Sequence, residues 1–175
     1  KNIGGITIAV HPAIARYARN FDKGCDPRGW GRWTAIELHG RKRKTIIIGT
    51  YAPTENNDED ASNSMWQRQL TAMDKIPDCQ REKNPLAQYI SDLDDTVAKI
   101  KAHKENYIVI IVGDTNINLH KDTSESRAWR ENMADRGLVN TLGKWWPSRR
   151  HQCHTWHNGQ NKSWIDHIYA PAEIM

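Results

Sequence analysis

The sequence predicts an α/β fold for this chain of 175 residues. Two runs rich in β-branched residues, 45–51 and 107–112, show no alternation of polar and apolar side chains, and such runs are typical of strands buried on both faces. A helical pattern over 84–103 leads directly into the second run, which is the helix-then-strand order of a layered α/β protein. The length fits one domain, 1–175, and neither an internal repeat nor an interdomain linker divides it.

The first third of the chain predicts three strands. A first strand is expected over 6–10, where Pro12 stops it. The segment 19–31 is rich in Gly, Pro, Asp and charge and predicts a loop. Strands over 32–38 and 44–51 follow, and the short connection between them predicts an antiparallel hairpin. The basic run at its tip, 41–44, could touch a phosphate backbone, although a solvated tip is the simpler interpretation.

Helical patterns dominate the middle of the chain. An acidic segment, 55–63, predicts a surface loop, and a helix is expected over 64–76, before Pro77. A stronger helix begins with Asn84 as N-cap and Pro85 in its first position and runs to about residue 103.

The last third predicts one helix and two strands. The helix starts near Asp122 and ends at Gly137, whereas 138–146 gives no clear pattern. Strands at 155–156 and 163–169 are joined by a turn that contains Asn158-Gly159.

The amino-acid composition limits the binding partners and the cellular compartment that can be expected for this protein. A net charge of +4 permits a phosphate-bearing partner without requiring one. Cys25, Cys79 and Cys153 are odd in number and widely spaced, which argues against a disulfide scaffold and for a reducing compartment, nuclear or cytoplasmic. No stretch approaches the ~18 apolar residues of a membrane span, so no membrane partner is expected. Because the chain begins at Lys1, a targeting signal is not readable from it.

Polar residues at three of the apolar strands, following two of them and lying within the third, form the candidate site. Tyr51 ends the second strand of the hairpin, Asp114 and Asn116 follow the run at 107–112, and Asp166 lies within the last strand. Gly113 allows close approach or an unusual φ, and Asp114 and Asn116 can project to one face. Strand ends of this kind suit a metal or a phosphate. The alternative is an Asx-type turn that simply ends a strand.

Four motifs, taken in order, resemble the endonuclease/exonuclease/phosphatase superfamily: Gly4 to Val10, Thr50-Tyr51-Ala52-Pro53-Thr54, Gly113-Asp114-Thr115-Asn116, and Trp164 to Tyr169. The motif that contains Tyr51 and Thr54, followed by an acidic loop, and Thr155-Trp156 ahead of Asp166 are most similar to the endonuclease domains of non-LTR retrotransposons. The resemblance covers nearly the whole chain.

The resemblance implies a four-layered α/β sandwich, with two sheets face to face and helices outside. It implies hydrolysis of phosphodiesters with Mg²⁺ (or Mn²⁺), as in a DNA endonuclease of a mobile-element, reverse-transcriptase-associated protein. Asp114 would bind the metal and activate water, and Asn116 would hold that water or a phosphate oxygen. Tyr51 would stabilise the charge of the transition state. Asp166 would hydrogen-bond the ring of a catalytic histidine.

This sequence departs from the pattern at both ends. The glutamate that binds the metal in the family lies on strands before the segment matched by 4–10, and a Ser-Asp-His segment should follow Tyr169. We therefore expect a partial domain that lacks its N-terminal strands and this C-terminal segment, completed by the rest of a larger polypeptide or by a second chain. His167 does not replace the missing histidine, because alternate residues of a strand face opposite sides.

Two alternative functions remain open. One is a catalytically inactive fragment that binds nucleic acid or protein, and the other is a phosphatase or phospholipid diesterase of the same fold. DNA is the expected partner of the nuclease.

Four further residues are expected to contact substrate. Thr54 belongs to the Tyr51 motif, and Trp164 is expected to line the site next to Asp166. Arg149 and Arg150, beside Trp145 and Trp146, form either a phosphate-contacting loop or ordinary surface. Trp30 and Trp33 are expected in the core.

A zinc site is a weaker hypothesis. It would use Cys153 with two of the histidines 151, 154 and 157, but the spacing fits no common zinc pattern.

Overall fold

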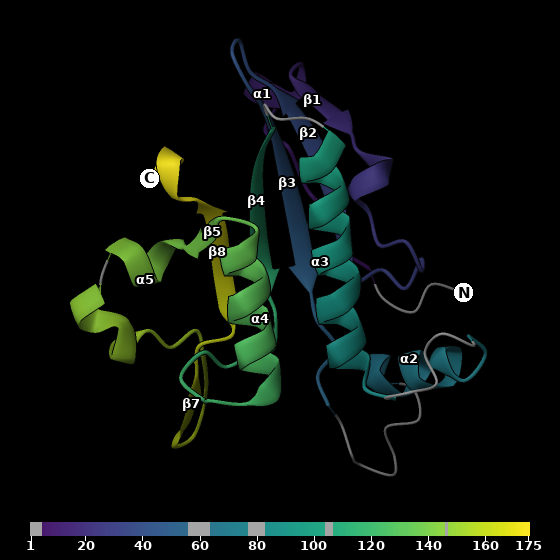
Figure 1. Ribbon diagram of the computed structural model, residues 1–175, viewed down its shortest axis with the longest axis vertical. Coiled ribbons are helices and arrows are strands. Elements are labelled where there is room, and N and C mark those ends of the chain that lie inside the picture. The colour runs from purple at the N-terminus through teal and green to yellow at the C-terminus, as the bar shows by residue number, and fades with distance from the viewer. Residues whose placement is uncertain (1–4, 56–63, 77–82, 104–106, 146) are drawn as a thin grey trace.

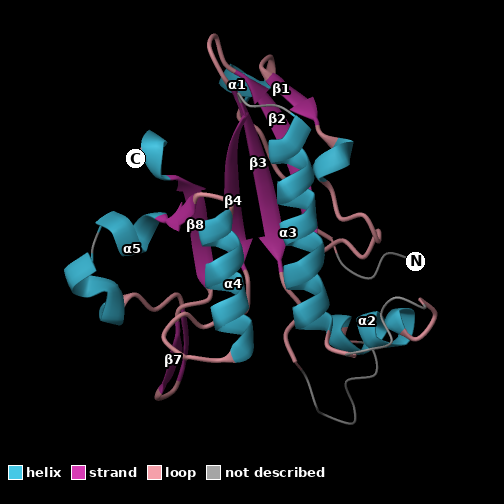
Figure 2. Ribbon diagram, in the orientation of Figure 1, coloured by secondary structure: helices cyan, strands magenta, loops and turns pink. Residues whose placement is uncertain are grey.

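The computed structural model describes residues 5–55, 64–76, 83–103, 107–145 and 147–175, except for the side chains of residues 103 and 149–151. A six-stranded mixed sheet forms its centre, with helices α3 and α4 packed against one face (Figure 1). We call this the inner face and the opposite one the outer face. Figure 2 shows the same separation of helices and strands. The α/β prediction is therefore confirmed.

The strands of the large sheet lie in the order β1-β2-β3-β4-β8-β5. Only β3 and β4 are parallel, and every other neighbouring pair in this sheet is antiparallel. Two further strands, β6 and β7, form a separate hairpin. The bounds are β1 (Ala18–Asn20), β2 (Trp33–His39), β3 (Lys44–Tyr51), β4 (Tyr107–Asp114), β5 (Leu138–Asn140), β6 (Trp156–Asn158), β7 (Asn161–Ser163) and β8 (Asp166–Pro171).

The helices begin where the sequence supplies caps. The side chain of Asn84 accepts hydrogen bonds from the N–H groups of Leu86 and Ala87, at 2.9 and 3.1 Å, at the start of α3. Thr123 and Ser126 form a capping box at the start of α4. The helices are α1 (Pro12–Ala15), α2 (Met65–Met73), α3 (Pro85–His103), α4 (Ser124–Asp135) and α5 (Thr141–Trp145), with 3₁₀ turns η1 (Asp22–Gly24), η4 (Pro147–Gln152) and η5 (Ala172–Ile174).

The core lies between the inner face and the two long helices. Strands β3 and β4 contribute Ile46, Ile48, Val109 and Ile111, which pack with aromatic and aliphatic side chains of α3 and α4. The alternate residues on the outer face are less covered, and Val112 is exposed. The prediction that both strands are buried on both faces is thus wrong for the described residues, because helices cover only one side of this sheet. A second sheet facing it is not present in this part of the chain.

Segment 6–10 is extended but is not a strand, contrary to prediction. Its side chains alternate between exposed and half-buried, and it crosses the outer face instead of joining the sheet edge. Ile6 and Ile8 pack over Gly49, where an added Cβ would lie 3.3 Å from Ile8. The edge itself is occupied by β1, whose last two residues, 19 and 20, fall in the segment 19–31 that was predicted to be a loop.

Three other boundaries differ from the predictions. Helix α2 ends at Met73, because Asp74 and Lys75 form a turn. The unclear stretch 138–146 contains β5 and α5. The last strand begins at Asp166 instead of residue 163, with a break at 164–165. Most of the acidic loop, and Cys79, lie outside the described residues. None of the helices described here combines the length and apolar character needed to cross a membrane.

Candidate functional site

Three polar strand ends meet on the outer face of the sheet. In the register of the large sheet Tyr51 of β3 lies opposite Asp114 of β4, and Asp114 lies opposite Asp166 of β8. Residues paired in this way project from the same face, so the three side chains form a row across adjacent strands. We call Tyr51, Asp114 and Asp166 the strand-end row. The sequence predicted these residues, and the register brings them together.

Gly113 lets β3 and β4 approach each other just before the row. Its φ is 145°, a conformation that residues with a side chain rarely adopt. A Cβ at this position would lie only 1.9 Å from the carbonyl oxygen of Thr50. Glycine is therefore required both by conformation and by space, and its predicted role is confirmed.

An Asx-type turn holds the carboxylate of Asp114. The N–H of Asn116 donates to Asp114 Oδ1 at 2.8 Å, and the Asn116 side chain donates to the carbonyl oxygen of Ala52 at 2.7 Å. Asn116 has a φ of 51°, in the left-handed region that asparagine tolerates better than most residues. The turn thus fixes the Asp114 carboxylate and ties the end of β4 to the chain after β3.

The row concentrates negative charge. Burial raises the pKa of Asp114, and the nearby charge of Asp166 raises it further, while the hydrogen bond from Asn116 acts in the opposite direction. In the described part of the chain no lysine, arginine or histidine forms an ion pair with either carboxylate. The hydroxyl-bearing Tyr51 beside them is 43% exposed. The row therefore presents ionisable oxygen atoms for which the described residues supply no countercharge.

A hard divalent cation fits this donor set, because Mg²⁺ and Mn²⁺ prefer carboxylate oxygens. The set is small. No group of three or more His, Cys, Asp or Glu side chains that could hold a metal occurs among the described residues. Asp114 and Asp166 are thus the two ligands that this part of the chain offers.

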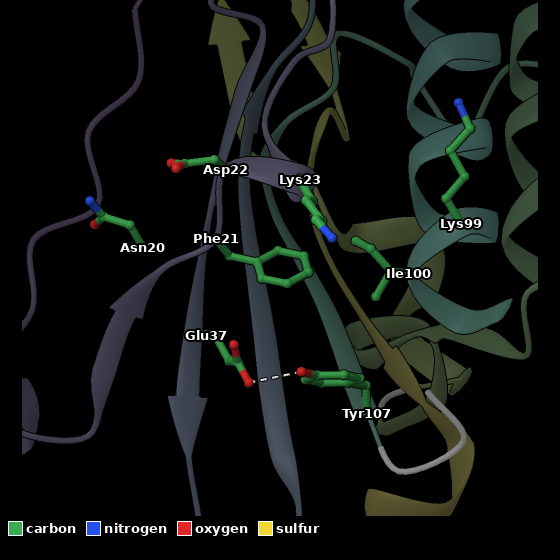
Figure 3. A pocket seen from close by; sticks show the side chains of 8 residues that line it. All are labelled: Asn20, Phe21, Asp22, Lys23, Glu37, Lys99, Ile100 and Tyr107. Carbon is green, nitrogen blue, oxygen red and sulfur yellow. Dashed lines mark hydrogen bonds between the residues drawn. The ribbon is translucent and has the colours of Figure 1, made fainter. Parts of the chain in front are cut away.

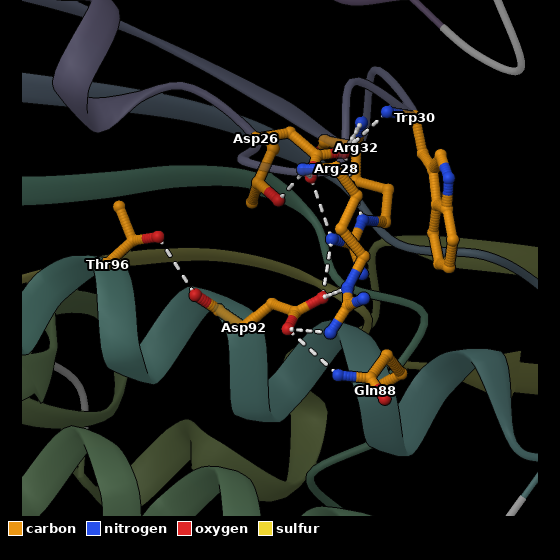
Figure 4. Close-up of polar contacts among 8 residues, drawn as sticks. Asp26, Arg28, Trp30, Arg32, Gln88, Asp92 and Thr96 are labelled. Carbon is orange, nitrogen blue, oxygen red and sulfur yellow. Dashed lines mark hydrogen bonds and ion pairs between the residues drawn. The ribbon is translucent and has the colours of Figure 1, made fainter. Parts of the chain in front are cut away.

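A buried ionic network supports the β3 end of the row (Figure 4). The carbonyl oxygen of Arg32 accepts hydrogen bonds from the N–H of Tyr51 and the hydroxyl of Thr50, at 2.9 and 3.2 Å. The Arg32 side chain is 0% exposed and donates to Asp26 and Asp92, in each case at 2.7 Å from Nη2. Sequence reasoning missed this network, because its residues looked like ordinary loop and helix-surface charges.

The β8 end of the row is fixed by Thr155. Its hydroxyl accepts hydrogen bonds from the N–H groups of Ile165 and Asp166, at 3.1 and 2.9 Å. Thr155 directly precedes the β6–β7 hairpin, whose turn contains Gly159 with a φ of 60°. The predicted turn at Asn158-Gly159 is confirmed, but the second strand of this hairpin is β7 and not the predicted strand 163–169, most of which forms β8 of the large sheet. The hairpin starts beside the row.

His167 lies on the inner face, as predicted. It is 2% exposed, and its Nε2 lies 3.1 Å from the carbonyl oxygen of Ile117. Burial lowers the pKa of His167 to about 4, so the ring is neutral at pH 7. It therefore does not contribute to the outer-face row.

Trp164 does not line the site, and this prediction is wrong. Its side chain is 0% exposed and packs against the rings of His120 and His167, with centroids 5.5 and 5.4 Å away. A continuous strand would place residues 164 and 166 on one face. Because the ladder begins only at Asp166, Trp164 turns into the core instead.

The remaining candidates are placed as follows. Thr54 is exposed just beyond Tyr51. The backbones of Arg149 and Arg150 lie in η4, but their side chains lie outside the described set. Trp145 is exposed and Trp146 lies outside the described residues, whereas Trp30 and Trp33 are buried, as expected.

The structure lends no support to the zinc hypothesis. Among the described residues Cys153 forms no disulfide, and it is half-buried, while His154 and His157 are exposed. The side chain of His151 is not among those described. Cys25 forms no disulfide within the described residues either.

No protein-family model matches the chain. No curated protein matches it either. Solved structures do. The AP endonuclease LMAP from Leishmania major is similar over 92% of this chain, with a TM-score of 0.57 and 14% identity. The endonuclease domain of TRAS1, a telomere-specific non-LTR retrotransposon, is similar over 89% of this chain, with a TM-score of 0.52 and 9% identity.

These likenesses concern the fold, because the identities are low. The chain spans about half the length of the structures that it matches, 55% of the first and 54% of the second. Together with the six-stranded mixed sheet and its helical layer, they confirm the α/β fold expected from the motifs, of which the described residues form one large sheet and the helices on one of its faces. The described part of the chain has a fold of the endonuclease/exonuclease/phosphatase type.

Proposed function

We propose that the strand-end row is part of a site for divalent-metal-dependent hydrolysis of phosphodiesters, with DNA as substrate, in the endonuclease of a mobile-element protein. The observation that carries the proposal is the register that sets Tyr51, Asp114 and Asp166 side by side on the outer face. A half-buried carboxylate, an exposed carboxylate and an exposed phenol, with no cationic partner among the described residues, are the groups that this reaction uses.

Asp114 would hold Mg²⁺ or Mn²⁺. The bound ion would polarise a phosphoryl oxygen and offset the charge that develops there. A raised pKa makes Asp114 a better proton acceptor for water than a solvated aspartate. The Asn116 N–H keeps its carboxylate in a fixed direction during this step.

Tyr51 and Asp166 have complementary roles. The exposed hydroxyl of Tyr51 would donate a hydrogen bond to a non-bridging oxygen, where negative charge grows in the transition state. The Asp166 carboxylate has no hydrogen-bond partner among the described residues, so it is available to orient a histidine ring. We propose that this ring comes from the rest of a longer polypeptide or from a second chain.

The hairpin next to the row favours a polymeric substrate. Trp156, His157 and Lys162 are exposed on β6 and β7, and an aromatic ring with a cationic side chain suits a nucleobase and a phosphate. Thr54, Arg149 and Arg150 remain proposed substrate contacts. A phosphatase or phospholipid diesterase would not need such a projection, and a panel of substrates with different leaving groups separates these activities.

A second candidate function is binding of nucleic acid without cleavage. It is favoured by the small donor set of the described residues and by the burial of His167 away from the row. It predicts binding to DNA that weakens steeply with salt, because phosphate contacts release counterions. It also predicts no metal-dependent turnover.

The test is nicking of supercoiled plasmid by this chain with Mg²⁺ or Mn²⁺, with EDTA as control. Asp114→Asn removes one charge from the row. Asp122→Asn makes the same chemical change at an exposed surface ion pair of α4 and serves as the matched control. We expect metal-dependent nicking to fall at least about a hundredfold in the first variant, the size of loss seen when a catalytic group is removed, and to persist in the second.

Equal activity of the two variants would refute a role for Asp114. If the folded chain does not nick DNA but binds it in a salt-dependent manner, the second function takes precedence. If nicking appears only when a separate polypeptide is added, the result would instead support completion of the site by another segment.

A further inference from the structure

A pocket of about 960 Å³ lies away from the strand-end row, at the opposite end of the sheet (Figure 3). It opens between the end of β1, η1, the last turns of α3 and the first residue of β4. Its volume is within the range of about 300–1,000 Å³ that is common for small-molecule sites. The lining residues are Asn20, Phe21, Asp22, Lys23, Glu37, Lys99, Ile100 and Tyr107.

The wall of the pocket is largely apolar and aromatic. Phe21 and Tyr107 lie with ring centroids 6.3 Å apart and an angle of 48° between their planes. Both are half-buried, and Ile100 beside them is buried. Figure 3 shows the Phe21 ring between Glu37 and Ile100. A flat aromatic ligand would find stacking and edge contacts here.

Glu37 supplies a directed acceptor. Its Oε1 accepts hydrogen bonds from the Tyr107 hydroxyl at 2.8 Å and from Lys44 Nζ at 2.7 Å. Burial would raise the pKa of Glu37, but the hydrogen bonds from Lys44 and Tyr107 outweigh it, so the pKa is lowered and the group is ionised at pH 7. Its other oxygen has no partner among the described residues and points toward Phe21 (Figure 3).

Two lysines supply positive charge. Lys23 and Lys99 line the pocket from η1 and α3, are exposed, and form no ion pair within the described part of the chain. The carboxylate of Asp22 points away from the Lys23 side chain (Figure 3). The Lys23 ammonium group points toward Ile100, whereas the Lys99 side chain extends away from the aromatic wall (Figure 3). Both side chains are exposed, so they can turn toward one anionic group, whereas Glu37 is held by Tyr107 and Lys44.

From this arrangement we infer that the pocket binds a nucleoside monophosphate. The base lies against Phe21 and Tyr107, and an amino group on its edge donates to the open oxygen of Glu37. The phosphate binds Lys23 and Lys99. This site differs from the strand-end row in residues, face and end of the sheet, and it does not depend on the function proposed for the row.

The experiment is isothermal titration of the chain with AMP, adenosine and ribose 5-phosphate. AMP carries all three recognised features, whereas each of the other two lacks either the phosphate or the base. We expect saturable binding of AMP and at least about tenfold weaker binding of the other two, because each loses charge-assisted hydrogen bonds or stacking. Absence of saturable AMP binding at millimolar concentration would refute the inference.

Variants assign the contacts. Lys99→Ala and Lys23→Ala should each weaken AMP binding by about fivefold and leave adenosine binding unchanged, since a single charge-assisted bond is lost. Lys121→Ala, an exposed lysine outside the pocket, is the matched control. Glu37→Gln should weaken AMP and adenosine equally and spare ribose 5-phosphate, with thermal unfolding used to check that the variant is folded. If both pocket lysine variants bind AMP as Lys121→Ala does, the assignment is wrong.

Discussion

Removing Asp26 should destabilise the protein more than any surface ion pair does. The Asp26 side chain is 2% exposed and receives two hydrogen bonds from the Arg32 guanidinium, from Nε at 3.0 Å and from Nη2 at 2.7 Å. It also accepts from the backbone N–H groups of Arg28, Trp30 and Arg32, between 3.0 and 3.2 Å. Asp26→Ala therefore removes the hydrogen-bond acceptor of three backbone N–H groups in the loop and one of the two carboxylate partners of the buried Arg32 guanidinium.

The magnitude follows from these contacts. Breaking a buried ion pair by removing one partner costs about 3–5 kcal/mol. Arg32 keeps its bond to Asp92, which places the loss of this pair near the lower figure. The three N–H groups add about 1 kcal/mol each where water does not reach them, and the truncated side chain leaves space for some water. We expect the free energy of unfolding to fall by about 4 kcal/mol.

Urea denaturation, followed by circular dichroism, measures this loss. Asp122→Ala is the matched control, because Asp122 also pairs with two arginines, Arg127 and Arg130, at 3.0 and 3.1 Å, but its side chain is 71% exposed. It should cost less than about 1 kcal/mol. If the two variants lose the same stability, the buried network does not hold the loop before β2, and the support that we assign to Tyr51 through Arg32 is wrong.

Three further predictions concern the strand ends. His167 is neutral in the folded protein at pH 7, because its pKa is lowered to about 4. Its contribution to the free energy of unfolding is therefore fully present above the ordinary histidine pKa of about 6.5, and that free energy falls by about 3 kcal/mol as the pH drops to 4. Urea midpoints measured across this pH range should fall less steeply for His167→Gln than for the unmodified protein. Gly113→Ala should cost about 3 kcal/mol or more, because its Cβ meets the backbone carbonyl of Thr50. Gly49→Ala should cost less on the same assay, because its Cβ meets only side-chain atoms of Ile6 and Ile8, at 3.3 Å or more. Asn116→Ala should lower the free energy of unfolding by about 2 kcal/mol, because it loses the hydrogen bond to Ala52 and places alanine at a left-handed φ. Asn116→Gly should lower it by about 1 kcal/mol, because glycine loses the same hydrogen bond but adopts this φ without strain. Equal losses would show that the left-handed φ carries no cost.

Local sequence patterns predicted most elements of the fold. Apolar β-branched runs identified β3 and β4, and Asn84 and Pro85 located the start of α3. The start of α4 was predicted near Asp122, one residue before its N-cap, Thr123. These patterns succeeded because these signals act between residues close in the chain. Segment 6–10 failed for the opposite reason, since an apolar β-branched run does not say whether its backbone pairs with a strand or crosses a sheet face.

The residues of the candidate site also differ in how far the sequence could predict them. Tyr51, Asp114 and Asp166 could be proposed from the sequence, because each follows or begins an apolar run. The burial of Trp164 could not, because it depends on a break in the ladder before Asp166. The sequence did not predict the hydrogen bond from Asn116 to Ala52 either, because the two residues are 64 positions apart in the chain.

The sequence by itself determined which residues end the strands and where glycine is needed, because backbone conformation and short-range periodicity decide those features. Only the tertiary structure decided that Tyr51, Asp114 and Asp166 share one face, since this depends on the register of three strands. It also brought Arg32 to Asp92 and Phe21 to Tyr107. Such contacts join residues that are far apart in the chain, and they form only when the sheet and its helices pack together.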